Sequence, residues 1–511
     1  MSILLKRRDF IRLAGAAAAS GFVPGSPRVA PRALSAPAKA GRPNVLFITL
    51  DDLRPELGCY GVDLIRTPNI DRLAAEGTAF TRAYCAQGVC NPSRVSILTG
   101  LRPDSHRVWD NETHFRQFNP GIMTLPQAFR SHGYLNAGIG KVFHATLPDP
   151  PSWIRFALPP EDTPVYMSKE TRARQARRED VARKQGYSQS WINAYLRGPS
   201  TEVSDTADSL HWDAILADLG IAMLGDIKNS QPFFLGIGFA KPHLPFVAPK
   251  RYWDLYRRED IPLAANGRPP RGAPPFAINN LTELASHEDL VDVPNPAEGS
   301  LDDDLARRLK HGYYACISFV DAQIGRLLDA LDAQGLRDKT IIVLLGDNGF
   351  KLGEHGSWGK LTNYETDVCA PLIVSAPGQK HPGKASAALV EMVDIYPTLC
   401  ELAGFAPPHE LEGTSLAPLL EDPSRPWKPA AFSQYPRGFT NRFMGRSMRT
   451  DRYRYTEWRD RIDDRQVAVE LYDHEADPGE DVNAAGDPAN KEIVRELAAR
   501  LAAGWKAARP K

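Results

Sequence analysis

Four short apolar runs constrain the fold of this chain more than any other feature. They are Asn44–Leu50, Tyr134–Ile139, Phe233–Phe239 and Thr340–Leu345. Each run is apolar almost throughout, which is typical of strands that are buried on both faces. Amphipathic stretches such as Thr67–Glu76 and Ala315–Ala333 lie between them. This alternation predicts an α/β fold with a large, mostly parallel sheet and helices on both sides.

The remaining segments predict two domains in the mature chain. Residues 161–205 are charged and predict a helical insertion, and residues 259–300 are rich in Pro, Gly and Asn and predict a long surface loop. After residue 425, short stretches alternate apolar with polar residues, as antiparallel strands do. We therefore expect a large domain over residues 41–425 and a small α+β subdomain with an antiparallel sheet over residues 426–511.

The first 40 residues predict an export signal. A twin-arginine pattern at Lys6–Ile11 precedes a short Ala/Gly-rich apolar run and a small-residue cleavage site at Ala36–Ala38. An ordinary Sec signal or a basic terminus is the alternative. The twin-arginine interpretation predicts a bacterial protein that is periplasmic or secreted. No later apolar run reaches the roughly 18 residues that a membrane span needs, so we expect no membrane contact in the mature form.

Charge and cysteine content exclude several classes of function. Lys and Arg together number 62, as do Asp and Glu, so no broad basic surface for nucleic acid is expected. Six cysteines without C-x-x-C spacing indicate neither a disulfide scaffold nor a zinc site. Only Cys90 stands in a sequence context that calls for chemistry.

Polar residues follow each of the four apolar runs. They are Asp51 and Asp52, Lys141 and His144, Lys241 and His243, and Asp347 and Asn348. Any one pair is explained by a turn or a helix cap. The carboxyl ends of parallel strands, however, meet at the edge of the sheet where ligands bind, so these residues together predict one site.

The chemistry of that set is consistent. Three carboxylates and an amide are oxygen ligands that suit Ca²⁺ or Mg²⁺ rather than zinc. Lysines and histidines beside a divalent cation form a site for a tetrahedral anion, in which lysines hold the charged oxygens and histidines move protons.

The stretch Cys90–Gly100 is the most specific in the chain. Pro92 suits a first helical turn and Gly100 the position after a helix ends, so Cys90 is expected at a helix N-terminus, which favours anions. A buried structural cysteine and a thiolate nucleophile with a histidine partner are the alternatives. Neither accounts for the metal-ligating residues.

This stretch resembles the signature C-x-P-S-R-x-x-x-L-T-G of the type I sulfatases at every fixed position. In that family the cysteine is oxidised to formylglycine by a formylglycine-generating enzyme, and the fold is alkaline-phosphatase-like. Further stretches resemble the iduronate-2-sulfatase branch: Asp51–Gly61, Gly140–His144, Lys241–Phe246, Leu352–Gly356, Val393–Leu399 and Glu470–Asp473.

The resemblance implies a role for each site residue. The implied ligands of Ca²⁺, with Mg²⁺ as the alternative ion, are Asp51, Asp52, Cys90, Asp347 and Asn348. The implied catalytic residues are Cys90, Arg94, Lys141, His144, His243 and Lys360. Arg94 would hold the formylglycine hydrate, Lys141 and Lys360 would bind the sulfate, and His243 would protonate the leaving alcohol. His144 would take a proton from the second hydroxyl.

The implied substrate is a sulfated carbohydrate, with a 2-O-sulfated uronic acid of a glycosaminoglycan or another sulfated polysaccharide as the specific expectation. Arg54 is the candidate for the uronate carboxylate, with a structural salt bridge as its alternative. Asn348 and Phe350 stand where the branch has histidine and tryptophan. A phosphoesterase or phosphonate hydrolase of the same superfamily, and a catalytically inactive sulfated-glycan-binding protein, are the alternative functions.

Overall fold

The computed structural model describes residues 41–229, 232–279 and 281–510. The predicted signal segment, residues 1–40, lies outside the described residues. Within them, no helix is long and apolar enough to cross a membrane.

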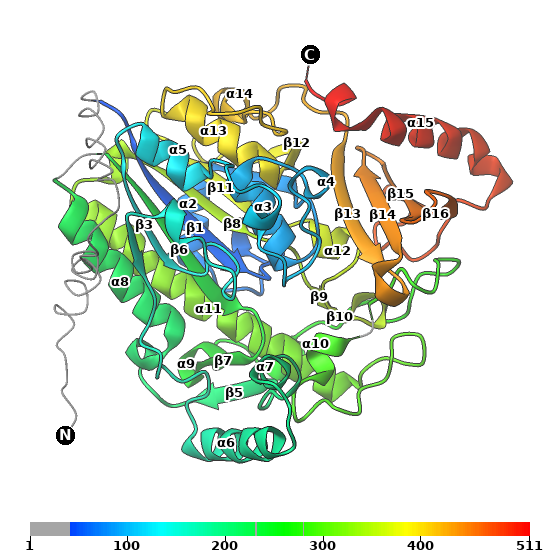
Figure 1. The fold of residues 1–511 in the computed structure, drawn as a ribbon, viewed down its shortest axis with the longest axis horizontal. Coiled ribbons are helices and arrows are strands. Elements are labelled where there is room, and N and C mark those ends of the chain that lie inside the picture. The colour runs from blue at the N-terminus through cyan, green and yellow to red at the C-terminus, as the bar shows by residue number, and fades with distance from the viewer. Residues whose placement is uncertain (1–40, 230–231, 280, 511) are drawn as a thin grey trace, which may run out of the picture.

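The centre of the molecule is an eight-stranded sheet (Figure 1). Its strands, in spatial order, are β12 (Ser386–Glu391), β2 (Thr78–Tyr84), β11 (Leu372–Ser375), β8 (Thr340–Gly346), β1 (Asn44–Asp51), β6 (Phe233–Pro242), β3 (Leu135–Gly140) and β4 (Arg155–Ala157). Only β11 runs antiparallel to its neighbours in this sheet. The four strands predicted from the apolar runs are confirmed, and they form the adjacent central set β8, β1, β6 and β3.

Helices cover both faces of the sheet, because the side chains of each central strand alternate between two cores. Leu46 and Ile48 of β1 pack with α2 (Pro68–Ala75), α8 (Trp212–Ile227) and α11 (Asp303–Ala333). Val45 and Phe47 point to the opposite face, which is covered by α3 (Cys90–Thr99), α5 (Leu125–Ser131) and α13 (Ile395–Leu402). Figure 1 shows these two helical layers on either side of the sheet. The mostly parallel α/β architecture is confirmed.

Shorter elements surround this core. The predicted helical insertion forms α6 (Lys169–Lys184) and α7 (Gln189–Tyr195), and β5 (Thr201–Ser204) then pairs with β7 (Phe246–Pro249). The segment 259–300 is largely loop, as predicted, but it contains the one-turn helix α10 (Thr282–Ala285). The others are α4 (Pro103–His106), α9 (Lys250–Trp253), β9 (Lys351–Leu352), β10 (Trp358–Gly359), α12 (Glu365–Val368) and α14 (Ala417–Glu421).

The C-terminal region forms a separate antiparallel sheet, as predicted. Its strands follow one another in the order β13 (Ala431–Arg437), β14 (Phe443–Arg449), β15 (Tyr453–Asp460) and β16 (Gln466–Asp473). The terminal helix α15 (Lys491–Ala507) lies along this sheet and buries Leu497 against Met448 and Tyr455 (Figure 1). The alternating pattern indicates β14, β15 and β16, whereas β13 was not predicted. The domain boundary at residue 425 stays a prediction.

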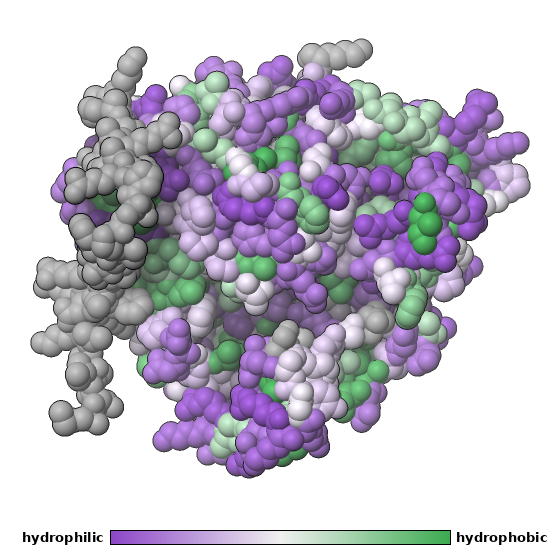
Figure 2. Space-filling view, viewed as in Figure 1, coloured by the Kyte–Doolittle hydropathy of each residue, from purple (hydrophilic) through white to green (hydrophobic). Residues whose placement is uncertain are grey.

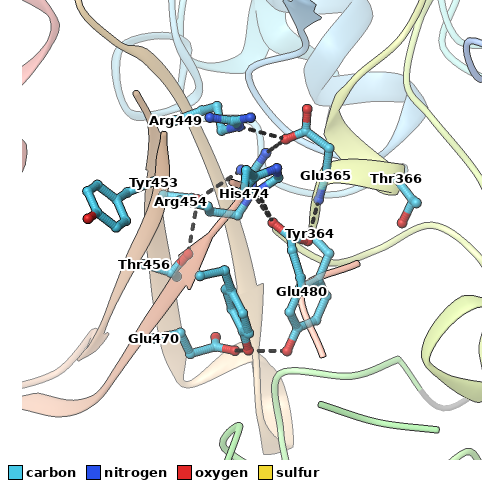
Figure 3. A network of polar contacts seen from close by, with 12 residues as sticks. Tyr364, Glu365, Thr366, Arg449, Tyr453, Arg454, Thr456, Glu470, His474 and Glu480 are labelled. Atoms are coloured by element: carbon cyan, nitrogen blue, oxygen red, sulfur yellow. Dashed lines mark hydrogen bonds and ion pairs between the residues drawn. The ribbon is translucent and has the colours of Figure 1, made fainter. Parts of the chain in front are cut away.

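A buried ionic network joins this sheet to the rest of the chain (Figure 3). Arg454 of β15 is only 1% exposed, and it pairs with Glu365 at the start of α12 and with Glu480, at 2.6 Å. His474 and Arg449 complete the network by contacting Glu480 and Glu365. Burial by itself would raise the pKa of Glu480, but Arg454 and His474 hold it well below its usual range. Arg454 is therefore the cation that allows two carboxylates to stay charged at this junction.

Replacing this cation tests the importance of the junction. We expect Arg454→Met to lower the free energy of unfolding by about 3–5 kcal/mol, because Glu365 and Glu480 lose their common partner in a buried environment. Urea titration followed by tryptophan fluorescence measures the loss. Since folding depresses the pKa of Glu480, its stabilising contribution is present above the unfolded value of roughly 4.3 and is lost as the pH falls below it.

Arg452→Met is the matched control, because Arg452 lies next to the same strand but pairs with Asp473 on the surface. An exposed pair of this kind contributes roughly 0–1 kcal/mol. Similar losses in the two variants would show that the buried network has no special role.

Candidate active site

The polar residues predicted at the strand ends come together at the carboxyl edge of the central sheet. β1 ends at Asp51, and Asp52 follows in a left-handed backbone conformation with φ of 62°. Asp347 lies just after β8. One carboxylate oxygen from each of the three residues lies within 4.8 Å of the others, and all three side chains are buried. Three buried carboxylates at this spacing require positive charge nearby.

Asn348 adds a fourth oxygen to this cluster. Its amide nitrogen donates to Asp52 Oδ1 at 2.8 Å and to the Gly349 carbonyl. Its Oδ1 is buried and has no hydrogen-bond partner among the described residues. A buried acceptor without a donor is costly unless something else binds it. The three carboxylates and this free amide oxygen fit a hard divalent cation such as Ca²⁺ or Mg²⁺.

Arg94 supports the cluster from α3. Its side chain is 1% exposed, and its Nε donates to Asp347 Oδ2 at 2.7 Å while Nη2 contacts Asp51 Oδ1 at 3.3 Å. Nη1 donates to Thr49 Oγ1 and to the carbonyl oxygens of Lys141 and Val142. The structure thus places Arg94 against two proposed metal ligands. Its expected role in holding a formylglycine hydrate stays a prediction.

The charge of the cluster is unevenly distributed. Burial raises the pKa of Asp347 to about 6, with Asp51 and Asp52 adding to the shift and Arg94 opposing it. Burial would also raise the pKa of Asp51, but Lys141, His243 and Arg94 hold it well below its usual range. Asp51 is therefore the carboxylate on which the nearby cations converge.

Cys90 lies beside this cluster as the first residue of α3. Val89 before it is extended, and Gly100 ends the helix in a left-handed conformation, as the sequence predicts. A Cys90 Sγ, an Asp51 oxygen and a His243 ring nitrogen lie within 4.8 Å of one another. Burial raises the pKa of the Cys90 thiol well above its usual value, and Asp51 adds to this effect. The unmodified thiol is therefore protonated near neutral pH, which disfavours the thiolate alternative.

Two lysines flank the carboxylates. Lys141, just after β3, pairs with Asp51 Oδ2, and Lys360, just after β10, pairs with Asp52 Oδ2 at 2.5 Å. Burial lowers their pKa values, but Asp51 and Asp52 more than offset it, so both pKa values lie above the usual lysine value. Both side chains are thus positively charged and adjacent to Cys90.

The two predicted histidines are in different environments. His144 Nδ1 is buried and has no partner among the described residues, and burial together with Lys141 lowers the pKa of His144 to about 3. His144 is therefore neutral near pH 7. The Nδ1 of His243 lies 2.6 Å from the Leu244 carbonyl, so Nε2 is the nitrogen that faces the site, 3.7 Å from Asp52 Oδ2.

Sequence reasoning missed Glu283, which the segment 259–300 brings into the site. Its Oε1 lies 3.0 Å from His243 Nε2 and its Oε2 lies 3.3 Å from Lys360 Nζ. Nothing in the local sequence distinguishes this glutamate from other acidic residues of a surface loop. Lys241, by contrast, turns away from the carboxylates and donates to the carbonyl oxygens of His243 and Pro245.

Arg54 has partners within the protein. Its Nη1 pairs with Glu354 at 2.9 Å and donates to the Phe350 carbonyl, and its Nη2 lies 3.4 Å from Glu56. This arrangement is the one expected from the salt-bridge alternative, and the role in uronate recognition stays a prediction. Phe350 stacks on Tyr313 at 5.7 Å, and its ring centroid lies 5.8 Å from Lys360 Nζ, so it forms part of the wall beside the predicted sulfate lysine.

A cavity of about 420 Å³ adjoins these residues. Lys141, His144 and His243 lie on its wall, so a molecule in the cavity reaches these three predicted catalytic residues. Much of the remaining wall is apolar and includes Phe143, Trp153, Phe156, Leu158, Val165, Met167, Trp212 and Phe319.

Comparisons with known proteins agree with this geometry. A family model described as Sulfatase matches residues 43–405, and one described as N-sulphoglucosamine sulphohydrolase, C-terminal, matches residues 353–506. The chain is 35% identical to iduronate 2-sulfatase of Homo sapiens, over 89% of this chain and 93% of that protein.

Solved structures with the same fold include a phosphonate monoester hydrolase of Agrobacterium radiobacter, with a TM-score of 0.70 and 25% identity over 91% of this chain and 96% of that one. A second is a protein in complex with its substrate D-glucosamine-2-N,6-O-disulfate, with a TM-score of 0.70 and 24% identity over 91% of this chain and 98% of that one. These likenesses confirm the alkaline-phosphatase-like α/β fold.

The family model spans most of the chain, and the human relative aligns along nearly the whole of both sequences. Membership in this family implies a divalent metal ion and a formylglycine nucleophile, for which the oxygen cluster and Cys90 are the fitting residues. The chain therefore belongs to the sulfatase family, and it is a sulfuric ester hydrolase.

Proposed function

We propose that this sulfatase removes the 2-O-sulfate of a uronic acid in fragments of a glycosaminoglycan or another sulfated polysaccharide. The proposal that this chain hydrolyses a sulfate ester rests on one observation: a four-residue oxygen cluster, two lysines and two histidines converge around Cys90. The similarity to human iduronate 2-sulfatase supports the specific sugar.

We propose Asp51, Asp52, Asp347, Asn348 and the modified Cys90 as the metal ligands, and Ca²⁺ as the ion, with Mg²⁺ as the alternative. The free Oδ1 of Asn348 supports this assignment. A bound divalent ion supplies positive charge that stabilises the sulfate oxygens and the attacking hydroxyl.

The first step follows from the positions of the cations. Lys141 and Lys360 hold the charged oxygens of the sulfate next to residue 90. One hydroxyl of the formylglycine hydrate gives its proton to a carboxylate of the oxygen cluster and forms a bond to sulfur while the bond from sulfur to the sugar oxygen breaks. His243 donates a proton from Nε2 to that sugar oxygen, which leaves as the alcohol. Glu283 faces the same nitrogen and so orients the ring.

The second step releases sulfate. His144 takes the proton of the remaining hydroxyl, which fits its neutral state near pH 7. The bond from carbon to the sulfate oxygen breaks as the aldehyde forms, and water then restores the hydrate. A serine at position 90 has no second hydroxyl on the same carbon, so it would keep the sulfate.

We also propose that a formylglycine-generating enzyme matures Cys90 and that residues 1–40 direct twin-arginine export to the periplasm or the medium. The signature Cys90–Gly100 supports the first proposal, and the Lys6–Ile11 pattern supports the second.

Mass mapping tests the nucleophile. We expect the peptide that contains residue 90 to be lighter than its sequence mass by about 18 Da, because oxygen replaces sulfur and two hydrogens are lost. In mature protein, Cys90→Ser should turn over at most once and accumulate a sulfated enzyme. Full activity of protein that carries only unmodified cysteine would refute the mechanism.

Metal removal tests the oxygen cluster. Chelation should abolish activity, and Ca²⁺ should restore it and raise the melting temperature, since binding to the folded state stabilises it. Asp347→Asn should no longer show the rise in melting temperature on Ca²⁺ addition. Its activity should fall by more than about 100-fold, because the loss of a ligand should exceed the roughly 10- to 100-fold effect of changing a residue that only supports a ligand. Asp304→Asn, at an exposed acid of α11, is the control and should retain both responses. Full activity of metal-free protein would exclude the proposal.

A substrate panel tests specificity. We expect a 2-O-sulfated uronate disaccharide to be cleaved with higher kcat/KM than a disaccharide sulfated elsewhere, and an aryl sulfate faster than the matched aryl phosphate. Failure on every 2-O-sulfated uronate would refute the sugar assignment alone. Faster hydrolysis of the phosphate would favour the phosphoesterase alternative, to which the solved phosphonate hydrolase is structurally similar. No turnover of any ester by modified, metal-loaded protein would favour the glycan-binding alternative.

A further inference from the structure

We propose that a second cavity, beyond His243, binds a further anionic group on the alcohol side of the scissile ester. This inference rests on the proposed function. The cavity has a volume of about 510 Å³ and is lined by α6, α7 and the residues that follow them. It shares Val165, His243, Leu244 and Pro245 with the cavity beside the catalytic residues, so the two spaces adjoin.

The position of His243 explains why the alcohol reaches this space. If His243 protonates the leaving oxygen, the rest of the alcohol lies on the His243 side of the sulfur. Both cavities meet there. Figure 2 shows a hollow on this face above the segment that carries α6 and α7, with hydrophilic residues around it (compare Figure 1).

The first cavity is unsuited to a second anion. Much of its wall beyond the catalytic residues is formed by aromatic and aliphatic side chains such as Phe156, Leu158 and Trp212. An anion placed against these side chains would lose its water without gaining hydrogen bonds. Lys241 also lines this cavity, but the carbonyl oxygens of His243 and Pro245 take two of the three N–H donors of its Nζ, whereas a guanidinium group has five such donors.

The second cavity offers two guanidinium groups. Arg172 of α6 donates from Nη1 to the carbonyl oxygens of Tyr166 and Met167, at 3.0 and 2.9 Å. Within the part of the chain that the structure describes, Arg172 pairs with no carboxylate. Arg197 contacts Glu283 Oε1 through Nη1 at 3.4 Å. Guanidinium groups bind carboxylate and sulfate groups through paired hydrogen bonds.

The acidic residues nearby do not neutralise these arginines. Glu179 lines the cavity but pairs with Arg183 at 2.9 Å. Glu283 is shared between Arg197, Lys360 and His243. Lys360 also pairs with Asp52, so Glu283 remains as the carboxylate partner of Arg197. Arg172 pairs with no carboxylate among the described residues. The cavity therefore carries excess positive charge, which an anionic part of the substrate would balance.

Glu283 also links the arginines of the second cavity to His243, the proposed proton donor. Glu283 Oε1 lies 3.0 Å from His243 Nε2 and 3.4 Å from Arg197 Nη1, so one oxygen atom separates the proposed proton donor from the arginine. An anion on the scissile sugar or on its neighbour can occupy this region. Both sources share the same chemistry, and the substrates chosen below distinguish them.

Arg172→Gln is the test variant, because Arg172 contacts none of the predicted catalytic residues. Arg174→Gln is the matched control on the same helix, since Arg174 is exposed and pairs with Glu288. Two pairs of sulfate esters are compared by kcat/KM. The first pair consists of two disaccharides in which the same 2-O-sulfated sugar is linked either to N-sulfated glucosamine or to N-acetylated glucosamine. The other compares a 2-O-sulfated uronate with its neutral sugar analogue. An aryl sulfate gives the reference activity of each variant.

We expect the wild type and Arg174→Gln to prefer the more anionic member of at least one pair. In Arg172→Gln that preference should fall by about tenfold, the effect of losing one charge-assisted hydrogen bond. A change confined to the glucosamine pair identifies the neighbouring sugar as the source of the anion, and one confined to the uronate pair identifies the scissile sugar. Preferences that are equal in all three proteins overturn the inference.

A measurement without turnover separates this inference from the proposed function. Isothermal titration calorimetry measures the binding of two ligands, the methyl glycoside of N-sulfated glucosamine and the methyl glycoside of glucuronic acid. At least one of these ligands should bind to the wild type and to Arg174→Gln. That binding should be at least about tenfold weaker in Arg172→Gln. Equal affinities, or no binding to any of the three proteins, reject the anion subsite even if the enzyme hydrolyses sulfate esters. Binding without hydrolysis would instead reject the proposed function and keep the subsite.

Discussion

The balance between buried carboxylates and buried cations is the constraint on which the rest of this active site depends. Asp51, Asp52 and Asp347 are almost completely buried and close together, which is unfavourable for three negative charges. Arg94 stabilises two of them from α3, and Lys360 stabilises the third from the other side. Because α3 also begins with Cys90, the contact that holds the carboxylates also fixes the proposed nucleophile beside them.

This arrangement explains why the site is at the centre of the sheet. The strands β8, β1, β6 and β3 are parallel neighbours, so the residues that follow them emerge at one edge. The left-handed conformation of Asp52 then turns the chain so that its carboxylate meets Asn348 and Lys360. A rigid, apolar sheet thereby positions groups that come from distant parts of the sequence, and these fixed charges can stabilise a transition state without reorganising.

The outer parts of the structure place further charged side chains beside the residues that follow the central strands. The segment 259–300 places Glu283 against His243, and the α6–α7 insertion brings Arg172 and Arg197 to the same side. Such segments contribute no strand to the central sheet, so they can vary without disturbing its carboxyl edge. The C-terminal sheet is attached to the core through Arg454, which pairs with Glu365 of α12 and with Glu480 in the segment after β16.

The sequence by itself determined the central strands, the carboxylates and the amide that follow them, and the position of Cys90 at the start of a helix. Runs such as Asn44–Leu50 are apolar on both faces, and polar residues follow each run directly, so local pattern was sufficient there. Only the tertiary structure decided the partners of side chains that meet across long sequence distances. It paired Arg54 with Glu354 and brought Glu283 to His243, because the stability of a buried ion pair depends on which charges folding places together and not on their order in the chain.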